Sequence, residues 1–180
     1  MAAGPVHRRS QIGRRKTRTI KTAGETFNAS VANIIPPQVA GELAQRAGLA
    51  DQSGWCPIDP ITFESKLWPG IHVVGDAISG GEMPKSAFAT NSQAKICAFA
   101  IGAALAGSEP TAPHLFNTCF TILAPNDAVT DAITFKPVAG SIKINDIFIS
   151  QVGESDELRR QGARTADGWY EAFTHDVFGL

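Results

Sequence analysis

Cysteine is scarce in this sequence, with three residues among 180: Cys56, Cys97 and Cys119. Three cysteines are too few for a disulfide scaffold. No pair of them has CxxC spacing with histidines nearby, as a structural zinc site would need. The odd number also leaves at least one thiol unpaired within the chain. The sequence therefore predicts neither a domain held by disulfides nor a metal centre.

Long apolar runs and an excess of charge of either sign are also missing. The longest apolar stretch, residues 96–105, is shorter than the roughly 20 residues that span a bilayer. Lys plus Arg number 16 against 17 for Asp plus Glu, so the formal net charge is −1 and no global field favours nucleic acid or acidic lipid. We expect a soluble protein of about one domain's length, without a membrane span or a nucleic-acid partner.

Charge is nevertheless uneven, because residues 1–21 hold seven of the sixteen basic residues and no acidic one. The seven are Arg8, Arg9, Arg14, Arg15, Lys16, Arg18 and Lys21. An export signal would need an apolar stretch of about 7–15 residues behind the charges, and none follows. A patch for nucleic acid or membrane is one interpretation. We favour a solvated, disordered leader, or foreign sequence in front of a truncated gene.

The rest of the chain alternates between strand-like and helix-like patterns. Two short strands are predicted within residues 17–35 around a turn at Gly24. A short helix is predicted over 38–47. The β-branched run at 71–74 is typical of a buried strand in a parallel sheet. Residues 87–106 predict the longest helix, with proline in its first turn and glycine just past its end.

Further along, the patterns predict three more strands and a closing helix, over residues 117–123, 129–137, 141–150 and 154–178. We expect the strands outside 71–74 to be antiparallel. The order of elements therefore indicates a mixed α and β fold, of the α+β or α/β class.

A polar cofactor site is suggested where the predicted strand at 71–74 ends. Gly75 and Asp76 follow it, a glycine pair stands at 80–81, and a helix begins near Met83. An aspartate at the end of a strand can accept hydrogen bonds from sugar or ribityl hydroxyls, and the free N–H groups of a helix start favour a negative ring or phosphate. The alternative is a turn with a capping role.

Longer motifs extend this pattern. They are the segments 62–65, 71–77 and 83–95, with 35–38 and 54–57 upstream and 117–120 and 168–170 downstream. Together these segments resemble the flavoprotein subunit of flavocytochrome c sulfide dehydrogenase, a member of the FAD-dependent pyridine nucleotide-disulfide oxidoreductase-like group. The resemblance covers roughly residues 25–179. It implies the C-terminal part of a flavoprotein with two dinucleotide-binding domains, ending in a mixed strand and helix domain at the flavin.

The resemblance implies FAD as the cofactor and gives roles to residues around the Gly-Asp pair. Asp76 would hold the ribityl chain, and Gly75 would let the backbone approach the cofactor. The start of the following helix would supply backbone N–H groups and positive potential to the pyrimidine side of the flavin; its residues are Met83, Pro84, Lys85 and Ser86. Lys85 has a simpler alternative as an exposed first-turn lysine.

Two residues near the end of the chain are the catalytic candidates that the resemblance implies. Cys119 would form an active-site disulfide with a cysteine of the family's N-terminal half, whose position lies outside this chain, and the disulfide would oxidise hydrosulfide. Trp169 would exclude water near the flavin and Cys119. The alternatives are a small buried hydrophobe for Cys119 and core packing for Trp169. We interpret Cys97 as core and Cys56 as structural.

Members of the family begin with a GxGxxG fold for the FAD adenylate and attach the flavin through an N-terminal cysteine; no GxGxxG occurs here. We therefore expect a truncated chain, inactive alone. The expected divisions are a leader at 1–21, a remnant of the central domain at 22–70, the end of the FAD-binding half at 71–107 and the flavin-binding domain at 108–180. Family members work in the periplasm with a c-type cytochrome, but neither an export signal nor a CxxCH haem site is visible here, so the location of this chain is left open. A non-catalytic domain that keeps only the fold or an interaction surface is the alternative.

Overall fold

The computed structural model describes residues 11–12, 19–22 and 24–179. The chain divides into two compact units, residues 1–39 and residues 40–180. Each unit is described by itself. Most of the predicted basic leader, and the greater part of its charge, lies outside the described residues.

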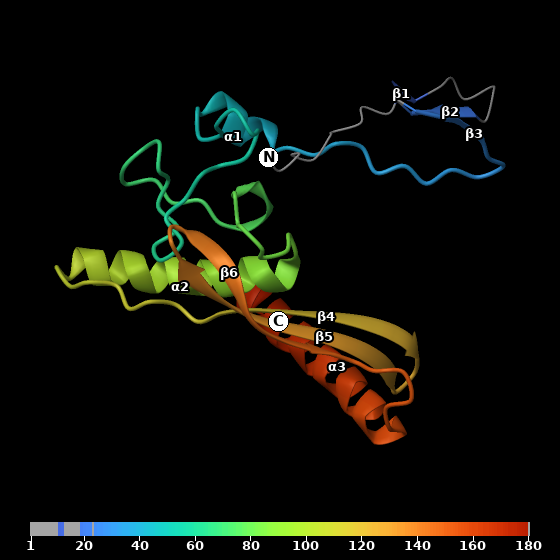
Figure 1. Cartoon of the computed structure of the whole chain (residues 1–180). Coiled ribbons are helices and arrows are strands. Elements are labelled where there is room, and N and C mark those ends of the chain that lie inside the picture. Colours follow the sequence, from blue (N-terminus) through green and yellow to red (C-terminus); the bar gives the residue numbers. More distant parts are fainter. Residues whose placement is uncertain (1–10, 13–18, 23, 180) are drawn as a thin grey trace. The chain divides into compact units, whose positions relative to one another are not determined.

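The first unit contains a small antiparallel sheet with strand order β1-β2-β3 (Figure 1). The strands are β1 (Gln11–Ile12), β2 (Thr19–Lys21) and β3 (Thr26–Asn28). In the turn between the last two, the Thr22 hydroxyl accepts hydrogen bonds from the backbone N–H groups of Gly24 and Glu25. The two short strands predicted around Gly24 are therefore confirmed, although the second ends at Asn28 and does not continue to residue 35.

The second unit combines one antiparallel sheet with three α-helices and a single 3₁₀ turn. Its elements are α1 (Glu42–Arg46), η1 (Gly75–Ala77), α2 (Ala87–Leu105), β4 (Leu115–Ala124), β5 (Asp127–Val138), β6 (Ser141–Ile149) and α3 (Asp156–Phe178). The sheet has the order β4-β5-β6. The predicted mixed α and β fold with antiparallel strands is confirmed; the setting of two dinucleotide-binding domains stays a prediction.

Two tight hairpins fix the register of this sheet. Asn126 in the first turn has φ 59°, and Ala139 and Gly140 in the second have φ 48° and 75°. Both central residues of the second hairpin have positive φ, which matches the right-handed twist of antiparallel strands, whereas the first hairpin has Pro125 before Asn126. The first hairpin sets Cys119 opposite Asp131. Because side chains alternate along a strand, the register decides which residues share a face.

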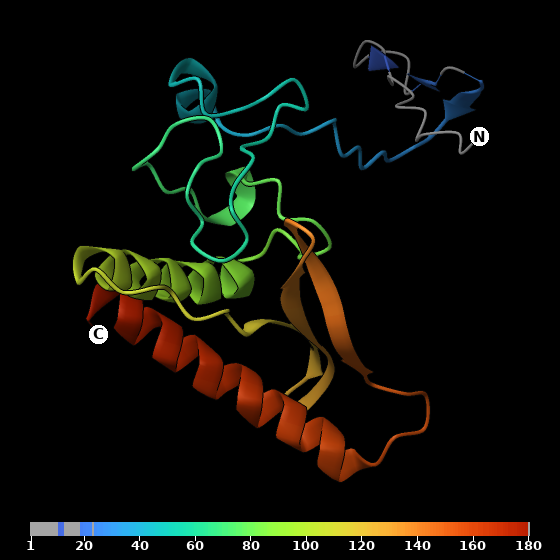
Figure 2. The ribbon, with the colours of Figure 1, turned by 60° about the vertical axis from the view of Figure 1, so that its left-hand side comes forward.

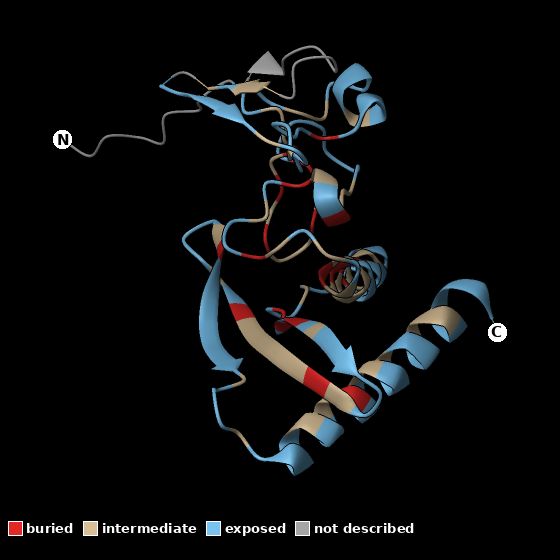
Figure 3. Ribbon diagram, turned by 90° about the vertical axis from the view of Figure 1, so that its right-hand side faces the viewer, coloured by how far each residue is buried: buried red, intermediate tan, exposed pale blue. Residues whose placement is uncertain are grey.

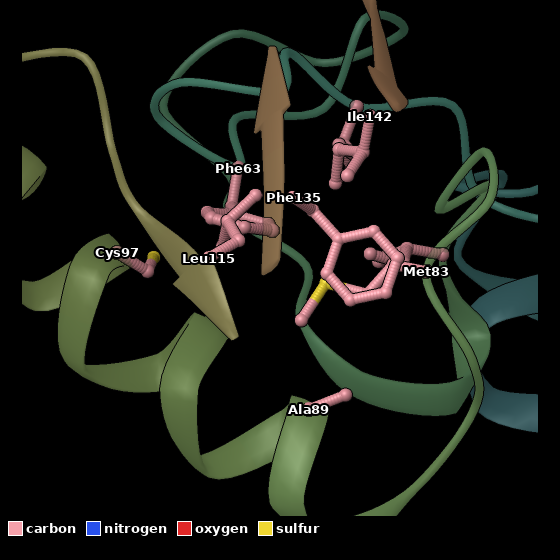
Figure 4. Close-up of a cluster of buried hydrophobic side chains, with 9 residues drawn as sticks. Phe63, Met83, Ala89, Cys97, Leu115, Phe135 and Ile142 are labelled. Atoms are coloured by element: carbon pink, nitrogen blue, oxygen red, sulfur yellow. The ribbon is translucent and has the colours of Figure 1, made fainter. Parts of the chain in front are cut away.

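One face of the sheet, called here the α2 face, packs against α2 and the loops before it. It carries Leu115 and Phe135 in the core, and Asn117 and Cys119 further along β4. Figure 4 shows core side chains converging there from the sheet, α2 and the loops. The buried cluster is Ile58, Phe63, Ile78, Met83, Ala89, Cys97, Leu115, Phe135 and Ile142.

The other face, called here the α3 face, is crossed by α3 (Figure 2). Arg159 fixes the beginning of α3 to β5, because its Nε and Nη2 donate to the two carboxylate oxygens of Asp127 at 2.6 and 2.7 Å. Near the other end of α3, Lys95 of α2 forms an ion pair with Asp176 at 2.5 Å. The closing helix therefore contacts both the sheet and the long helix.

Helices α2 and α3 confirm the two long helices predicted from the sequence, because their capping signals are local. Ser86 accepts a hydrogen bond from the Ala89 N–H at the start of α2, and Ser155 accepts one from the Leu158 N–H at the start of α3. The predicted helix over 38–47 shrinks to α1. Its apolar spacing is not used for packing, since Leu43 is 83% exposed.

The strand predicted at 71–74 is wrong. His72 forms one isolated bridge with Glu64, and the Val73 N–H donates to the Phe63 carbonyl at 2.9 Å. The chain then enters the 3₁₀ turn η1. A buried parallel strand needs a partner on each side, and among the described residues only the loop that contains Phe63 and Glu64 pairs with this run.

Candidate functional site

The Gly-Asp turn packs directly against the first half of α2. Gly75 is buried with φ 81°, and its N–H donates to the Gln93 Oε1 at 2.7 Å. A Cβ at this position would lie 3.1 Å from Thr90 Cγ2, tighter than ordinary contact. Glycine therefore lets the turn adopt a left-handed backbone and approach the helix. The neighbouring Asp76 side chain is exposed, so its carboxylate is accessible to a ligand.

Lys85 folds back over this turn. Its Nζ donates to the backbone carbonyls of Asp76 and Ile78, both at 2.8 Å, and lies 3.7 Å from the centre of the Trp55 ring. Partial burial lowers the pKa of Lys85, while the charges of Asp76 and Cys56 oppose that shift. The ammonium group therefore joins the turn to the helix start, while the residue as a whole is exposed, and both interpretations of Lys85 stay predictions.

The other three residues predicted at the helix start differ in what they can offer a ligand. The Met83 side chain belongs to the core and its N–H donates to the Gly80 carbonyl at 3.1 Å. Pro84 has no N–H. Ser86 caps α2 through its hydroxyl. Of the four predicted residues, Lys85 and Ser86 are therefore the ones whose amides could serve a ligand, and Met83 and Pro84 have the role of shaping the turn.

Cys119 is the exposed cysteine of the three in the chain, whereas Cys56 and Cys97 are buried. Burial raises the pKa of the Cys56 and Cys97 thiols, which disfavours their reactive thiolate forms. Cys119 opens into a shallow hollow of about 170 Å³ beside Thr121 and Ile149. Its position does not fit the alternative of a small buried hydrophobe.

A chain of hydrogen bonds joins Cys119 to the start of α2. The Ser86 hydroxyl donates to the Asn117 Oδ1 at 2.6 Å, and the Asn117 Nδ2 donates to the Cys119 Sγ at 3.5 Å. On the neighbouring strand, the Asp131 Oδ1 accepts the backbone N–H of Cys119 at 3.0 Å. Two segments that the sequence pointed to separately, the helix start and the Cys119 motif, are therefore in contact.

Trp169 lies on the α3 face, opposite Cys119. Its ring stacks on Phe88 and on Phe173, with centroids 5.3 and 5.2 Å apart. Together with Ser86 and Phe120 it lines a hollow of about 360 Å³ at the start of α2. The fold thus brings Trp169 to the helix start but does not bring it to the same face of the sheet as Cys119.

Sequence reasoning missed a cavity of about 610 Å³ that lies between α3 and the sheet. Five of its fifteen lining residues are aromatic: Phe88, Phe116, Phe120, Phe148 and Trp169. The signal was present in the alternation of aromatic residues along 116–120. It could not be used without knowing that α3 crosses this face.

The residues present fit the flavin end of FAD. A carboxylate is exposed at Asp76, and the helix start has positive potential and a hydroxyl cap at Ser86. The Cys119 thiol is connected to that same helix start. The Asp76 carboxylate suits a ribityl chain, and the start of α2 suits the electron-rich edge of the flavin ring. The Cys119 thiol suits a reaction with sulfur. The roles of the individual residues stay predictions.

Comparison with known families agrees with the resemblance seen in the sequence. Residues 111–178 match a family described as "Flavocytochrome c sulphide dehydrogenase, flavin-binding". The matched region contains β4, β5, β6 and α3, and therefore Cys119, Asn117 and Trp169. Over these residues the chain is similar to the flavin-binding domain of that family, so FAD is the cofactor by resemblance, and the family's name implies a cytochrome partner. In the part of the chain that the structure describes, no helix is both long enough and apolar enough to cross a membrane.

Proposed function

We propose that the chain is the flavin-binding part of a sulfide:cytochrome c oxidoreductase, with Cys119 as one half of its redox disulfide. The main support is that Cys119 is exposed inside the matched region and is linked through Asn117 to Ser86 at the start of α2. A reactive sulfur and a helix start that favours negative charge are thus next to each other. Hydrosulfide is the substrate.

The chemistry begins at the disulfide of Cys119 with a second cysteine. Hydrosulfide attacks one sulfur of this bond, the sulfur–sulfur bond breaks, one cysteine leaves as a thiolate and the other carries a persulfide. In this exchange the two electrons of the sulfide sulfur pass to the disulfide, and FAD, when bound, would supply the two-electron acceptor that takes them from the released thiolate. Asp76 would hold the ribityl chain, the start of α2 would hold the pyrimidine side, and Trp169 would keep water out.

The test is Cys119→Ser in flavin-loaded protein that also contains the GxGxxG half expected from the resemblance. We expect fold and flavin absorbance to remain, while anaerobic flavin reduction by sulfide falls by orders of magnitude, because the attacked or leaving sulfur is gone. Cys97→Ala, a change at a buried thiol in α2, is the matched control and should keep sulfide-dependent reduction. Unchanged reduction in Cys119→Ser would refute the role of Cys119.

A non-catalytic interaction module is the second candidate, and exposed isoleucines on β6 favour it. Ile147 and Ile149 are 48% and 52% exposed on the α2 face. If protein that contains both halves binds no flavin, this second function replaces the first. We also propose that the isolated chain cannot retain FAD. Flavin absorbance near stoichiometry in the purified 180-residue chain would contradict the last point.

A further inference from the structure

Asn117 is a buried polar side chain whose orientation is fixed from both sides. It is 1% exposed on the α2 face of β4. The Ser86 hydroxyl oxygen already accepts the Ala89 N–H at 3.0 Å, so the hydroxyl hydrogen is directed to the Asn117 Oδ1 at 2.6 Å. An amide oxygen accepts and an amide nitrogen donates. The Asn117 Nδ2 must therefore point away from Ser86, and it lies 3.5 Å from the Cys119 Sγ.

We infer that Asn117 is a positioning residue that holds the Cys119 sulfur and favours its thiolate by donating an N–H to it. This inference rests on the proposed function, since it concerns the thiol proposed to react there. A donor stabilises a charged sulfur more than a neutral one. The hydrogen bond from Ser86 also attaches the Asn117 side chain to the start of α2. The position of the Cys119 sulfur relative to the helix start is therefore fixed.

Other charged and polar groups near Cys119 could also stabilise or destabilise its thiolate. On β5, Asp131 faces Cys119 and its Oδ1 accepts the Cys119 backbone N–H. Ile149 at the end of β6 and Ser150 just after it line the hollow without adding charge. At the start of α2, the Lys85 ammonium is engaged by the Asp76 and Ile78 carbonyls. With a carboxylate close on β5, the Asn117 amide is the donor that supports a negative sulfur.

The experiment follows alkylation of Cys119 by iodoacetamide in the 180-residue chain as a function of pH, with the modified cysteine identified by peptide mass mapping. Asn117→Asp keeps an acceptor for Ser86 but replaces the N–H donor by an anionic oxygen. We expect the pH of half-maximal alkylation to rise by about one unit, and the rate at neutral pH to fall about tenfold, because the thiolate is the nucleophile.

Asn145→Asp is the matched control. It makes the same charge change at an exposed amide on β6, whose Nδ2 bonds the Thr134 hydroxyl at 3.2 Å, and should leave the alkylation profile unchanged. A folded Asn117→Asp protein with the wild-type profile, or with a shift equal to that of Asn145→Asp, would overturn the inference. Far-UV circular dichroism establishes folding in each case.

If Asn117→Asp does not fold, Ser86→Ala is the variant that tests the role of Asn117. It leaves the Asn117 amide in place but removes the hydroxyl that orients it, and the loss of one helix cap is a small perturbation of folding. We expect a smaller rise, with the neutral rate reduced about two- to threefold; a wild-type profile would overturn the inference. Alkylation requires no flavin, so these results are independent of sulfide-dependent flavin reduction. Unchanged flavin reduction in Cys119→Ser, or its absence in the flavin-loaded wild-type protein, would refute the proposed function alone.

Discussion

The two faces of the sheet β4-β5-β6 are covered in different ways. The α2 face is tightly packed at one end, where Leu115 and Phe135 are at most 1% exposed, and open at the other, where Cys119 is exposed. Figure 3 shows that the strands of the second unit have both buried and exposed segments. The α3 face is covered by one amphipathic helix and keeps a cavity lined by aromatic rings, with Phe148 57% exposed. The buried side chains that stabilise the sheet are therefore concentrated on the α2 face, whereas hollows open to solvent occur on both faces.

This difference separates the candidate residues as well. Cys119 and its partner Asn117 depend on the α2 face and on the start of α2. Trp169 depends on α3 and on ring stacking with Phe88. Phe88 belongs to the first turn of α2 and contacts Trp169, while Ser86 before it contacts Asn117. The start of α2 therefore contacts residues on both faces of the sheet at the edge strand β4. A change there should affect both candidates, whereas changes on the sheet should affect one.

The largest expected effect on stability is at the packed end of the α2 face. Phe135→Ala should lower the free energy of unfolding by about 3–5 kcal/mol, because it leaves a cavity in the main core. Phe148→Ala, the same change on the α3 face, should cost less than about 1 kcal/mol, since much of that ring is already exposed to water. Urea unfolding followed by circular dichroism measures both; equal losses would remove the contrast between the faces.

A smaller effect is expected at the turn that supports the helix start. Gly75→Ala should cost about 1–3 kcal/mol, because φ is 81° and the new Cβ would be crowded by Thr90. Gly102→Ala, at an open position inside α2, should instead stabilise by up to about 1 kcal/mol. Thermal unfolding compares the two variants. Stabilisation by Gly75→Ala would show that the backbone of the turn can adjust to the new Cβ without strain, and would contradict this prediction.

The smallest effect is expected for the ion pair between Lys95 and Asp176, which joins the helices on the two sides of the sheet. The hydrogen bond from Lys95 lowers the pKa of Asp176. The stabilisation is therefore present above the carboxylate's unfolded pKa, about 4, and is lost as pH falls through the lower folded value. Both side chains are partly exposed, so the coupling should be small and weakened by salt. A double-mutant cycle at neutral and acidic pH measures it; coupling that grows at low pH would contradict the assignment.

The elements that could be predicted from sequence are those with local signals. Residues 87–105 and 156–178 form helices because serine caps and helix-forming residues are adjacent in the chain. The strands β4, β5 and β6 follow from alternating side chains and tight turns. The run at 71–74 was misjudged because β-branched residues indicate a strand only if partner strands lie beside them, and here one bridge to Glu64 forms.

The sequence by itself determined the mixed fold, the resemblance of residues 111–178 to a flavin-binding family and the motifs that contain Asp76, Cys119 and Trp169, since composition, spacing and residue order carry this information. The tertiary structure decided which of these residues meet. Strand register put Cys119 and Trp169 on opposite faces, and the packing of α2 against β4 made Asn117 the link between Ser86 and the thiol. Such contacts join residues about thirty positions apart, and their geometry exists only once the sheet and the helix have packed together.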